Sequence, residues 1–358
     1  MRRSYTTVLI VPTGIGAAIG GYAGDALPVA RSLAQVSDCL ITHPNVLNGA
    51  QLYWNLPNTL YVEGYGLDQF AAGKWGLAPV HQNRVGLILD QGIEVDLRVR
   101  HLQAADAARA TLGLHLTDYI VTDAPLGVEL KAAASGATWG TIANPDSLLR
   151  AAERAIQEAG ADAIAVVARF PDDLGSEALQ SYRQGKGVDP LAGAEAVISH
   201  LIVREFQLPC AHAPALSPLP LDPTISPRSA AEELGYTFLP CVLVGLNRAP
   251  RFVEYSTDPQ QDQIWADQVD AVVVPATAFG GSAVMHLGRS RSAASPLIIA
   301  VRENHTRMQV PPELLGISAV RVNSYLEAVG MVAAHRAGVY PAALNAAIAP
   351  LQWLDDIK

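Results

Sequence analysis

Short apolar runs rich in valine and isoleucine recur along the chain, each followed by a small or polar cluster and then by a helical pattern. The runs are continuous rather than alternating, which is typical of strands covered on both faces in a parallel sheet. We therefore predict an α/β fold, with mostly parallel sheets and helices on both faces. The predicted strands are Val8–Val11, Cys39–Thr42, Val85–Asp90, Tyr119–Thr122, Ala163–Ala168, Cys241–Val244, Ala271–Val274, Leu297–Val301 and Ala319–Val322.

Two helices are well defined by their end signals. The first covers Ser147–Ala159; it follows Asn144-Pro145-Asp146, which is typical of a helix start, and Gly160 ends it. The second covers Tyr325–Ala337 and ends at Gly338.

A proline-rich segment separates two parts of this pattern. Six of the 24 prolines lie between Pro209 and Pro227, which excludes an internal helix or a central strand there. The segment is either an interdomain linker or an ordered loop that crosses a site, and its low charge favours the loop. We predict one α/β lobe over 1–208, the crossing segment over 209–232 and a second α/β lobe over 233–358.

The segments VLIVPTGIGAAIGG (8–21) and AVVVPATAFGGSAV (271–284) resemble each other. One interpretation is two similar lobes that face each other across a cleft. The other is that turns from strand to helix converge on proline and glycine without duplication.

The chain is 50% apolar and only 16% charged, with a formal net charge of −9. These values exclude a disordered chain and a basic nucleic-acid-binding face.

The apolar N-terminal run imitates a secretion signal, but its glycines and proline favour a strand. No apolar run is long enough for a membrane helix, so no membrane partner is expected. Three widely spaced cysteines indicate a cytoplasmic protein, and the low surface charge favours a homo-oligomer.

Ligands of open α/β sheets bind outside the carboxyl ends of the strands, where glycines and helix N-termini present backbone amides. The loop after Val8–Val11 lacks the third glycine of a dinucleotide fingerprint, because Ile19 occupies its position, and no P-loop lysine follows. A small anionic molecule, phosphorylated or carboxylated, is the expected partner. The residues predicted to bind it are Gly14, Gly16, Gly20, Gly21, Gly280, Gly281, Ser282 and Asn45.

His43 follows the second strand and is the predicted acid/base residue, with Asp25 or Glu303 beside it. The alternative roles are structural: a helix N-cap for Asp25, and a hydrogen bond to a neighbouring backbone carbonyl for His43. This reading predicts an isomerase, a lyase or a hydrolase.

Two other functions stay open. Cys210 and His212, with His200 and Glu195 before them, would suit a thiol or metal hydrolase, although their spacing matches no specific zinc motif. A non-catalytic ligand-binding or assembly protein is the third hypothesis. The sequence identifies no cofactor and no metal.

Five segments of the chain are characteristic: PTGIGAAIGGYAGDA, THPNVLNGA, PCAHAPAL, AAEELGYTFLPCVLVGL and SYLEAVG. Together they resemble an uncharacterised family, a numbered domain of unknown function known mainly from oxygenic phototrophs. The resemblance runs over nearly the whole chain and implies one family-wide unit, but it transfers no activity, cofactor or catalytic residue.

Overall fold

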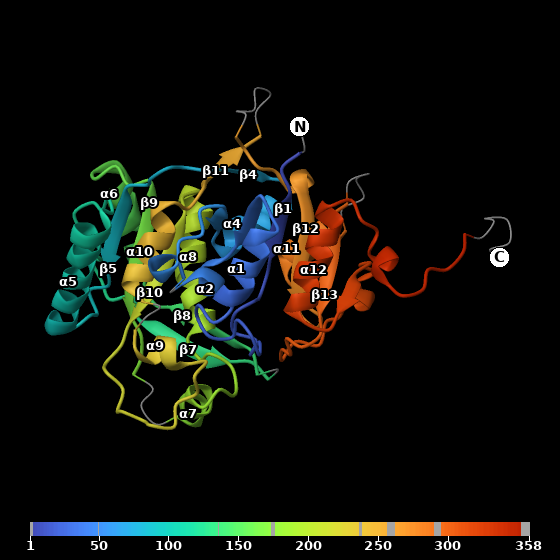
Figure 1. Cartoon of the computed structure of the whole chain (residues 1–358). Coiled ribbons are helices and arrows are strands. Elements are labelled where there is room, and N and C mark those ends of the chain that lie inside the picture. Colours follow the sequence, from blue (N-terminus) through green and yellow to red (C-terminus); the bar gives the residue numbers. More distant parts are fainter. Residues whose placement is uncertain are drawn as a thin grey trace.

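The fold is α/β, as predicted, with two mainly parallel sheets (Figure 1). The computed structural model describes residues 3–48, 50–134, 136–172, 176–235, 238–255, 262–289 and 295–351. The larger sheet has six strands, and every neighbouring pair in it is parallel. In spatial order they are β14 (Val320–Val322), β13 (Leu297–Val301), β12 (Val269–Pro275), β1 (Thr6–Leu9), β2 (Cys39–Thr42) and β3 (Thr59–Tyr61).

The chain reverses its direction of travel across this sheet between β1 and β12. The strands β1 to β3 run outward on one side, and β12 to β14 run outward on the other, which is the doubly wound order. Alternate residues of β1 face opposite layers: Leu9 packs with helices α1 (Leu27–Gln35) and α12 (Tyr325–Arg336), whereas Val8 packs with α4 (Gly64–Ala71) and α11 (Ser282–Gly288). The carboxyl ends of β1 and β12 therefore border a switch point, where ligands of such folds bind.

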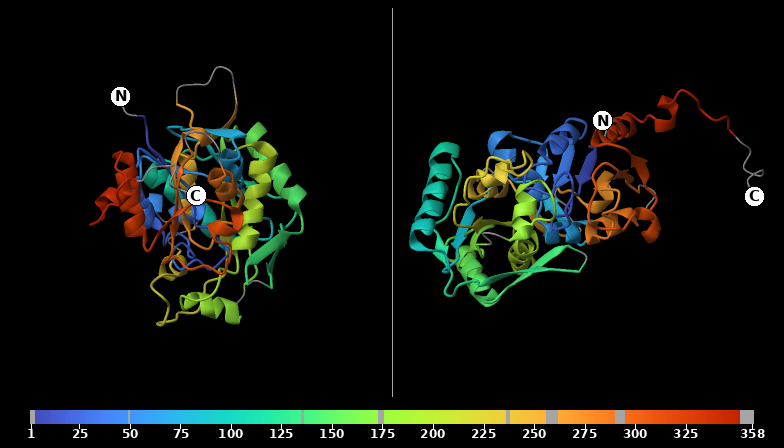
Figure 2. Two further views of the ribbon diagram at one scale, coloured as in Figure 1. Left: turned by 90° about the vertical axis from the view of Figure 1, so that its right-hand side faces the viewer. Right: turned by 90° about the horizontal axis from the view of Figure 1, so that it is seen from below.

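The smaller sheet is inserted in the sequence between β3 and β12 (Figure 2). An antiparallel ribbon of β4 (Trp75–Ala78) and β11 (Arg251–Glu254) carries the chain out to it and back. A hairpin of β7 (Val128–Ala132) and β8 (Thr138–Ile142) packs on α8 (Ala192–Phe206). In spatial order, the parallel strands of the smaller sheet are β10 (Cys210–Ala215), β9 (Ala163–Arg169), β5 (Val85–Leu89) and β6 (Ile120–Val121).

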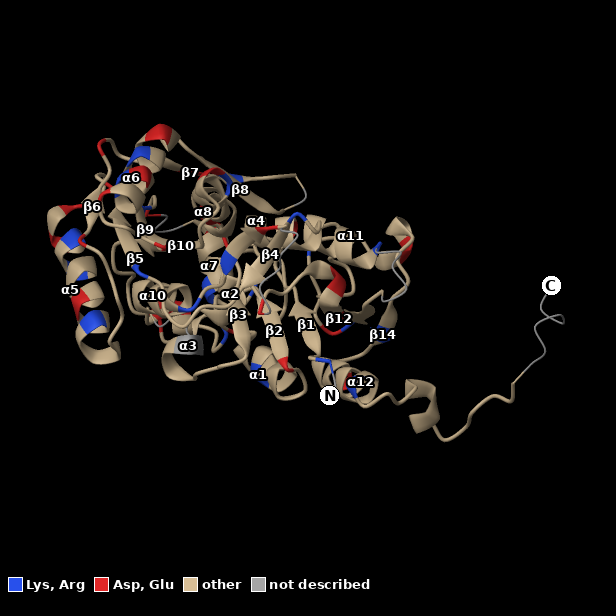
Figure 3. Cartoon of the chain, turned by 90° about the horizontal axis from the view of Figure 1, so that it is seen from above, with Lys and Arg blue, Asp and Glu red and all other residues tan. Residues whose placement is uncertain are grey.

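Four of the remaining helices are long enough to cover faces of the sheets. They are α5 (Val95–Leu112), α6 (Pro145–Gln157), α8 (Ala192–Phe206) and α10 (Leu239–Asn247). Figure 3 shows charged residues of both signs along α5 and α6, whereas the strands are largely uncharged. The short elements are α2 (Pro44–Leu47), α3 (Ala50–Tyr53), α7 (Glu177–Arg183), α9 (Ala230–Glu233), and the 3-10 turns η1 (Ala266–Gln268), η2 (Pro312–Leu315) and η3 (Pro341–Leu344).

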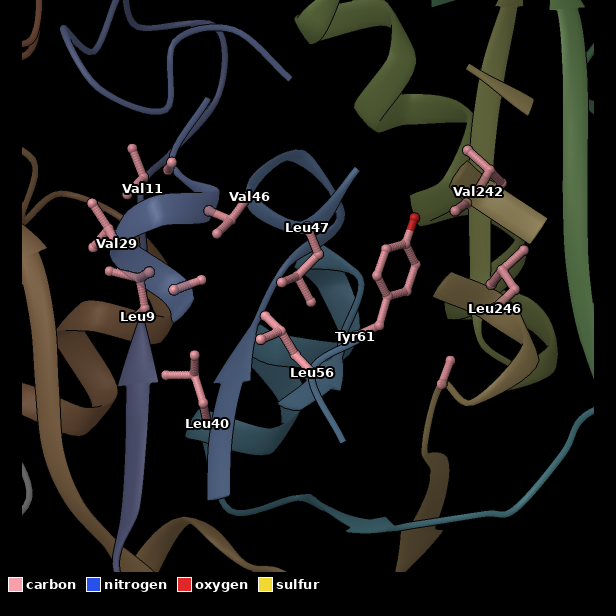
Figure 4. Close-up of a cluster of buried hydrophobic side chains, with 14 of the residues drawn as sticks. Leu9, Val11, Val29, Leu40, Val46, Leu47, Leu56, Tyr61, Val242 and Leu246 are labelled. Atoms are coloured by element: carbon pink, nitrogen blue, oxygen red, sulfur yellow. The ribbon is translucent and has the colours of Figure 1, made fainter. Parts of the chain in front are cut away.

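One hydrophobic cluster joins the two sheets (Figure 4). Tyr61 at the end of β3 lies between Leu47 and helix α10, which contributes Val242 and Leu246. Gly245 of α10 lies against the Tyr61 ring, since an added Cβ would be only 2.5 Å from Tyr61 Cε2. The helix α10 is thus the piece that packs the two sheets together.

The prediction of a strand at Cys241–Val244 was wrong, because these residues lie in α10. The helix is buried around most of its circumference, so it shows no polar stripe and its apolar run resembles a buried strand. The other predicted strands coincide with β1, β2, β5, β6, β9, β12, β13 and β14, with small shifts at their ends. The predicted helices Ser147–Ala159 and Tyr325–Ala337 correspond to α6 and α12.

The proline-rich segment begins with a strand, β10, which the sequence analysis did not expect. β10 is an edge strand of the smaller sheet, a place where Pro214 is tolerated. The two similar segments, 8–21 and 271–284, contain the neighbouring strands β1 and β12 of one sheet rather than facing each other across a cleft. The larger sheet also combines strands from both predicted lobes, 1–208 and 233–358.

Candidate functional site

A cavity of about 910 Å³ lies at the carboxyl end of the six-stranded sheet. Thr13 beyond β1, His43 beyond β2 and Ser282 at the start of α11 line it on the side of the larger sheet. Helix α8 and strand β10 of the smaller sheet line the opposite side. The cavity therefore combines the switch point of the doubly wound sheet with groups from the inserted sheet.

Glu63, on the side of the larger sheet, forms an ion pair with His200, which lies on α8 at the opposite side of the cavity. Glu63 follows β3 and is the N-cap of α4, where its Oε2 accepts hydrogen bonds from Tyr65 N at 2.8 Å and Gly66 N at 3.2 Å. Its Oε1 pairs with Nδ1 of His200 on α8. The His200 side chain is 42% exposed, and its Nε2 has no partner among the described residues. Burial favours the neutral ring, but the bond to Glu63 and the charges of Glu63 and Asp68 raise the pKa of His200.

A second histidine and carboxylate pair lies beside the first. Glu195 and Ser199 are one turn apart on α8 and both contact His212 on β10. His212 Nδ1 is 3.1 Å from Ser199 Oγ, and His212 Nε2 is 3.7 Å from Glu195 Oε2. The helix thus orients the imidazole from both of its nitrogens, and all three residues line the cavity.

Buried carboxylates with raised pKa values border the same space. Burial raises the pKa of Glu232 to about 7, although Glu232 accepts hydrogen bonds from Tyr182 Oη and Ala23 N, each at 2.6 Å. Burial and the charges of Glu195 and Glu232 raise the pKa of Asp189 well above its ordinary value. These carboxyl groups therefore hold protons at a pH where ordinary carboxylates have lost them.

The chain matches a family of proteins of unknown function (DUF3326) over residues 6–345. It belongs to this family. It is also 62% identical, over 353 residues, to a protein of Synechococcus sp. (strain ATCC 27144 / PCC 6301 / SAUG 1402/1) whose name is "uncharacterized lipoprotein". The match covers 99% of this chain and 97% of that protein. No solved structure matches. Among the described residues, no helix has the length and apolar character that crossing a membrane requires.

His43 lines the cavity, as does Asn45. The imidazole of His43 is buried, and its Nε2 accepts a hydrogen bond from Val11 N at 3.1 Å. Burial lowers the pKa of His43 to about 4, so the ring is neutral at pH 7. Asn45 Nδ2 donates to Gly20 O at 2.7 Å. Both side chains thus also hold the loop after β1. His43 does bond to the backbone, but its partner is the Val11 amide rather than the carbonyl that the sequence suggested.

Asp25 and Glu303, the predicted partners of His43, both accept hydrogen bonds from backbone amides of the protein. Asp25 is not the N-cap of α1, which is Ala26; its Oδ1 accepts from Gly20 N at 2.6 Å and its Oδ2 from Arg228. Burial raises the pKa of Asp25 to about 6. Glu303 accepts a hydrogen bond from Tyr325 N at 2.7 Å, at the start of α12. Neither carboxylate is among the described residues that line the cavity.

The predicted anion-binding glycines divide into two groups. Gly281 and Ser282 line the cavity, whereas no described lining residue comes from the group Gly14, Gly16, Gly20, Gly21 and Gly280.

Two of the amides in these loops have partners within the chain. Gly20 N donates to Asp25, and Ala283 N in the first turn of α11 donates to Asp68 Oδ1 at 2.8 Å. Carboxylates of the protein itself therefore take places that an anionic ligand would occupy.

The structure brings together His200, His212 and Glu195 of the predicted hydrolase site, but Cys210 is fully buried in the core of the smaller sheet. Burial raises the pKa of the Cys210 thiol well above its usual value, which disfavours the reactive thiolate. Among the described residues, no group of three or more histidine, cysteine, aspartate or glutamate side chains could hold a metal ion.

Sequence reasoning missed Glu63, Ser199, Asp189 and Glu232. The signal for Glu63 was available, because the run Thr59–Val62 has strand character and Glu63-Gly64 follows it where a helix begins. Ser199 lies within a helix and resembles any other helical serine. Asp189 and Glu232 flank α8 and the proline-rich segment, far from any predicted strand end.

Proposed function

We propose that this protein is an enzyme that transfers protons, of the isomerase or lyase type, with its active site in the cavity between the two sheets. The observation that carries the proposal is that two histidine and carboxylate pairs, Glu63 with His200 and Glu195 with His212, line one cavity. Two histidines in different environments are suited to give a proton at one position and take it at another.

The roles follow from the contacts. His200 has a raised pKa, and its Nε2 bonds to none of the described residues, so it is the proposed proton donor. His212 is the proposed base, with its ring oriented by Ser199 and Glu195. His43, which is neutral and holds a backbone amide, is a positioning residue in this proposal. The lining carboxylates do not favour the anionic substrate expected from the glycine loops, and a neutral or cationic substrate suits them better.

Proton transfer at carbon is tested without knowing the substrate. We would incubate the purified protein with a metabolite extract in D₂O and follow deuterium incorporation by mass spectrometry. The wild-type protein should label at least one metabolite, and His200→Gln or His212→Gln should each slow that labelling about 10²-fold or more.

The matched control is His81→Gln, an exposed histidine that is not among the described lining residues, and it should label at the wild-type rate. Labelling that is the same in the wild type and in the His200→Gln/His212→Gln double variant would contradict the proposal. Such a result would favour the non-catalytic ligand-binding protein.

The predicted cytoplasmic location and homo-oligomer stay predictions. The word lipoprotein belongs to the name of the Synechococcus relative; for this chain, the few widely spaced cysteines are what support the cytoplasm. Cell fractionation tests the location, and recovery of the chain with membranes would contradict it. Analytical ultracentrifugation tests the oligomer, and a sedimentation coefficient of a 37.9 kDa monomer would contradict it.

A further inference from the structure

The cavity is much longer than the acid/base centre. Its lining extends from Ser282 on α11 to Leu97 on α5, and Figures 1 and 2 place these two helices on different sides of the molecule. Its volume of about 910 Å³ lies near the upper end of the roughly 300–1,000 Å³ that is typical of sites for drug-sized ligands. A very small metabolite at the two histidines would leave most of this space empty.

Apolar side chains line the end of the cavity toward α5, beside Arg100 and His101 of α5 itself. They come from α5, from the residues after β10 and from the segment between α9 and α10. We call them the apolar wall: Leu97, Ala104, Leu216, Leu219, Leu234 and Phe238. Leu234 is 68% exposed.

The end of the cavity at the histidines is rich in carboxyl groups. His200 is paired with Glu63, and Glu195 contacts His212, whereas burial and the neighbouring carboxylates raise the pKa values of Asp189 and Glu232. Of the two arginines among the described lining residues, Arg183 is paired with Glu233 and Arg100 lies on α5. An ammonium group placed among these carboxyl groups would favour their ionised forms, whereas a further carboxylate would be repelled.

We propose that the cavity binds an amphipathic amine, with its ammonium group facing Glu195, Asp189 and Glu232 and its hydrocarbon body along the apolar wall. This inference rests on the site of the proposed function and names the class of its substrate. The inference needs both ends of the cavity. The apolar wall selects the hydrocarbon body of the ligand, and the carboxylates select the positive charge of its ammonium group.

The probes are n-alkylamines from butylamine to octylamine, compared with the alkanols and alkanoates of equal length by isothermal titration calorimetry. The affinity for the amines should rise up to about fourfold for each added methylene, because each buried methylene contributes about 0.8 kcal/mol. At any one length, the amine should bind more tightly than the alcohol, and the alcohol more tightly than the carboxylate.

Two variants separate the two ends. Leu219→Ser/Leu234→Ser should lower the affinity for octylamine about tenfold or more and leave that for butylamine nearly unchanged. Glu195→Gln should lower the affinity for amines and not for alkanols. Leu326→Ser is the matched control, since Leu326 is 82% exposed on α12 and is not among the described lining residues; it should change neither affinity.

An affinity that does not depend on chain length, or tighter binding of alkanoates than of amines, would overturn the proposal. The same titrations with His200→Gln/His212→Gln keep the two proposals distinct. If that variant keeps the dependence on chain length while no metabolite is labelled by the wild type, the ligand class stands and the proton-transfer function fails. If labelling occurs but the amines show no such dependence, the ligand class fails alone.

Discussion

Both parallel sheets have carboxylates at the switch point, but the two groups are in opposite electrostatic situations. At the smaller sheet, between β5 and β9, a cavity of about 310 Å³ is lined by Asp90, Arg169 and Asp172. Arg169 bonds to Asp172 and to Glu94, and its guanidinium holds the pKa of both carboxyl groups below their usual range. At the larger sheet, burial raises the pKa of Glu232, and it raises that of Asp25 even though Arg228 is bonded to it.

This difference distinguishes carboxylates with a structural role from carboxyl groups that are available for chemistry. Both oxygens of Asp90 accept backbone hydrogen bonds, from Gly92, Leu126 and Arg169, so this carboxylate holds the loops of the fold together. At the larger sheet, carboxyl and imidazole groups line an open cavity and can change protonation near neutral pH. The presence of acids at a strand end therefore does not identify a site; the partners of those acids do.

The largest expected effect comes from removing the cation of the structural cluster. Arg169 is 17% exposed and binds two carboxylates, so Arg169→Met should lower the free energy of unfolding by about 2–3 kcal/mol. The matched change, Arg228→Met, removes a guanidinium that is 49% exposed from Asp25 and should cost under about 1 kcal/mol. Urea unfolding measures both, and equal losses would break the comparison.

The pH dependence of stability should have opposite signs in the two regions. Glu232 has a folded-state pKa of about 7, so it favours the folded state at low pH, and this contribution is lost as the pH rises from about 4.5 to about 7. Asp172 has a lowered pKa, so its contribution is present above about pH 4 and is lost as the pH falls below that value.

Two isosteric variants test these signs. Relative to the wild type, Glu232→Gln should become more stable as the pH is raised from 5 to 8. Asp172→Asn should be destabilised at pH 7, and the difference should shrink below pH 4. Thermal unfolding in a series of buffers gives both profiles, and parallel profiles for the two variants would show that the regions do not differ.

The smallest effect is a separation of histidine titrations within the larger cavity. His43 should remain neutral until about pH 4, whereas His200 should titrate above 6.5, because Glu63 stabilises its charged form. Two-dimensional NMR of the imidazole groups measures both curves, and Glu63→Gln should move that of His200 downward and leave that of His43 in place. A normal titration of His43 would remove the reason for calling it a positioning residue.

Some parts of the site could be predicted from local patterns. The continuous apolar runs located β1, β2, β12 and β13, and the rule about carboxyl ends then placed His43, Asn45 and Ser282 beside a cavity. Proximity in the sequence also suggested the group of Glu195, His200 and His212, which α8 and β10 bring together. Asp172, which follows β9, is bonded to Arg169 and Ser217; the neighbouring Asp173 lies outside the described residues.

Other parts depended on contacts that no local pattern contains. Glu63 acquires its role only because α8 brings His200 to it from 137 positions further along the chain. The helix α10 resembled a strand because a helix that is buried on most sides has no polar face to mark it in the sequence. Likewise, the two similar glycine-containing segments became neighbours in one sheet through strand pairing.

By itself, the sequence determined the class of the fold, since strand length, residue type and the glycine and proline signals act within a few residues of each other. Tertiary structure decided which carboxylates are neutralised and which retain a proton. That outcome depends on burial and on charges contributed by distant segments, and these exist only when the inserted sheet packs against the first.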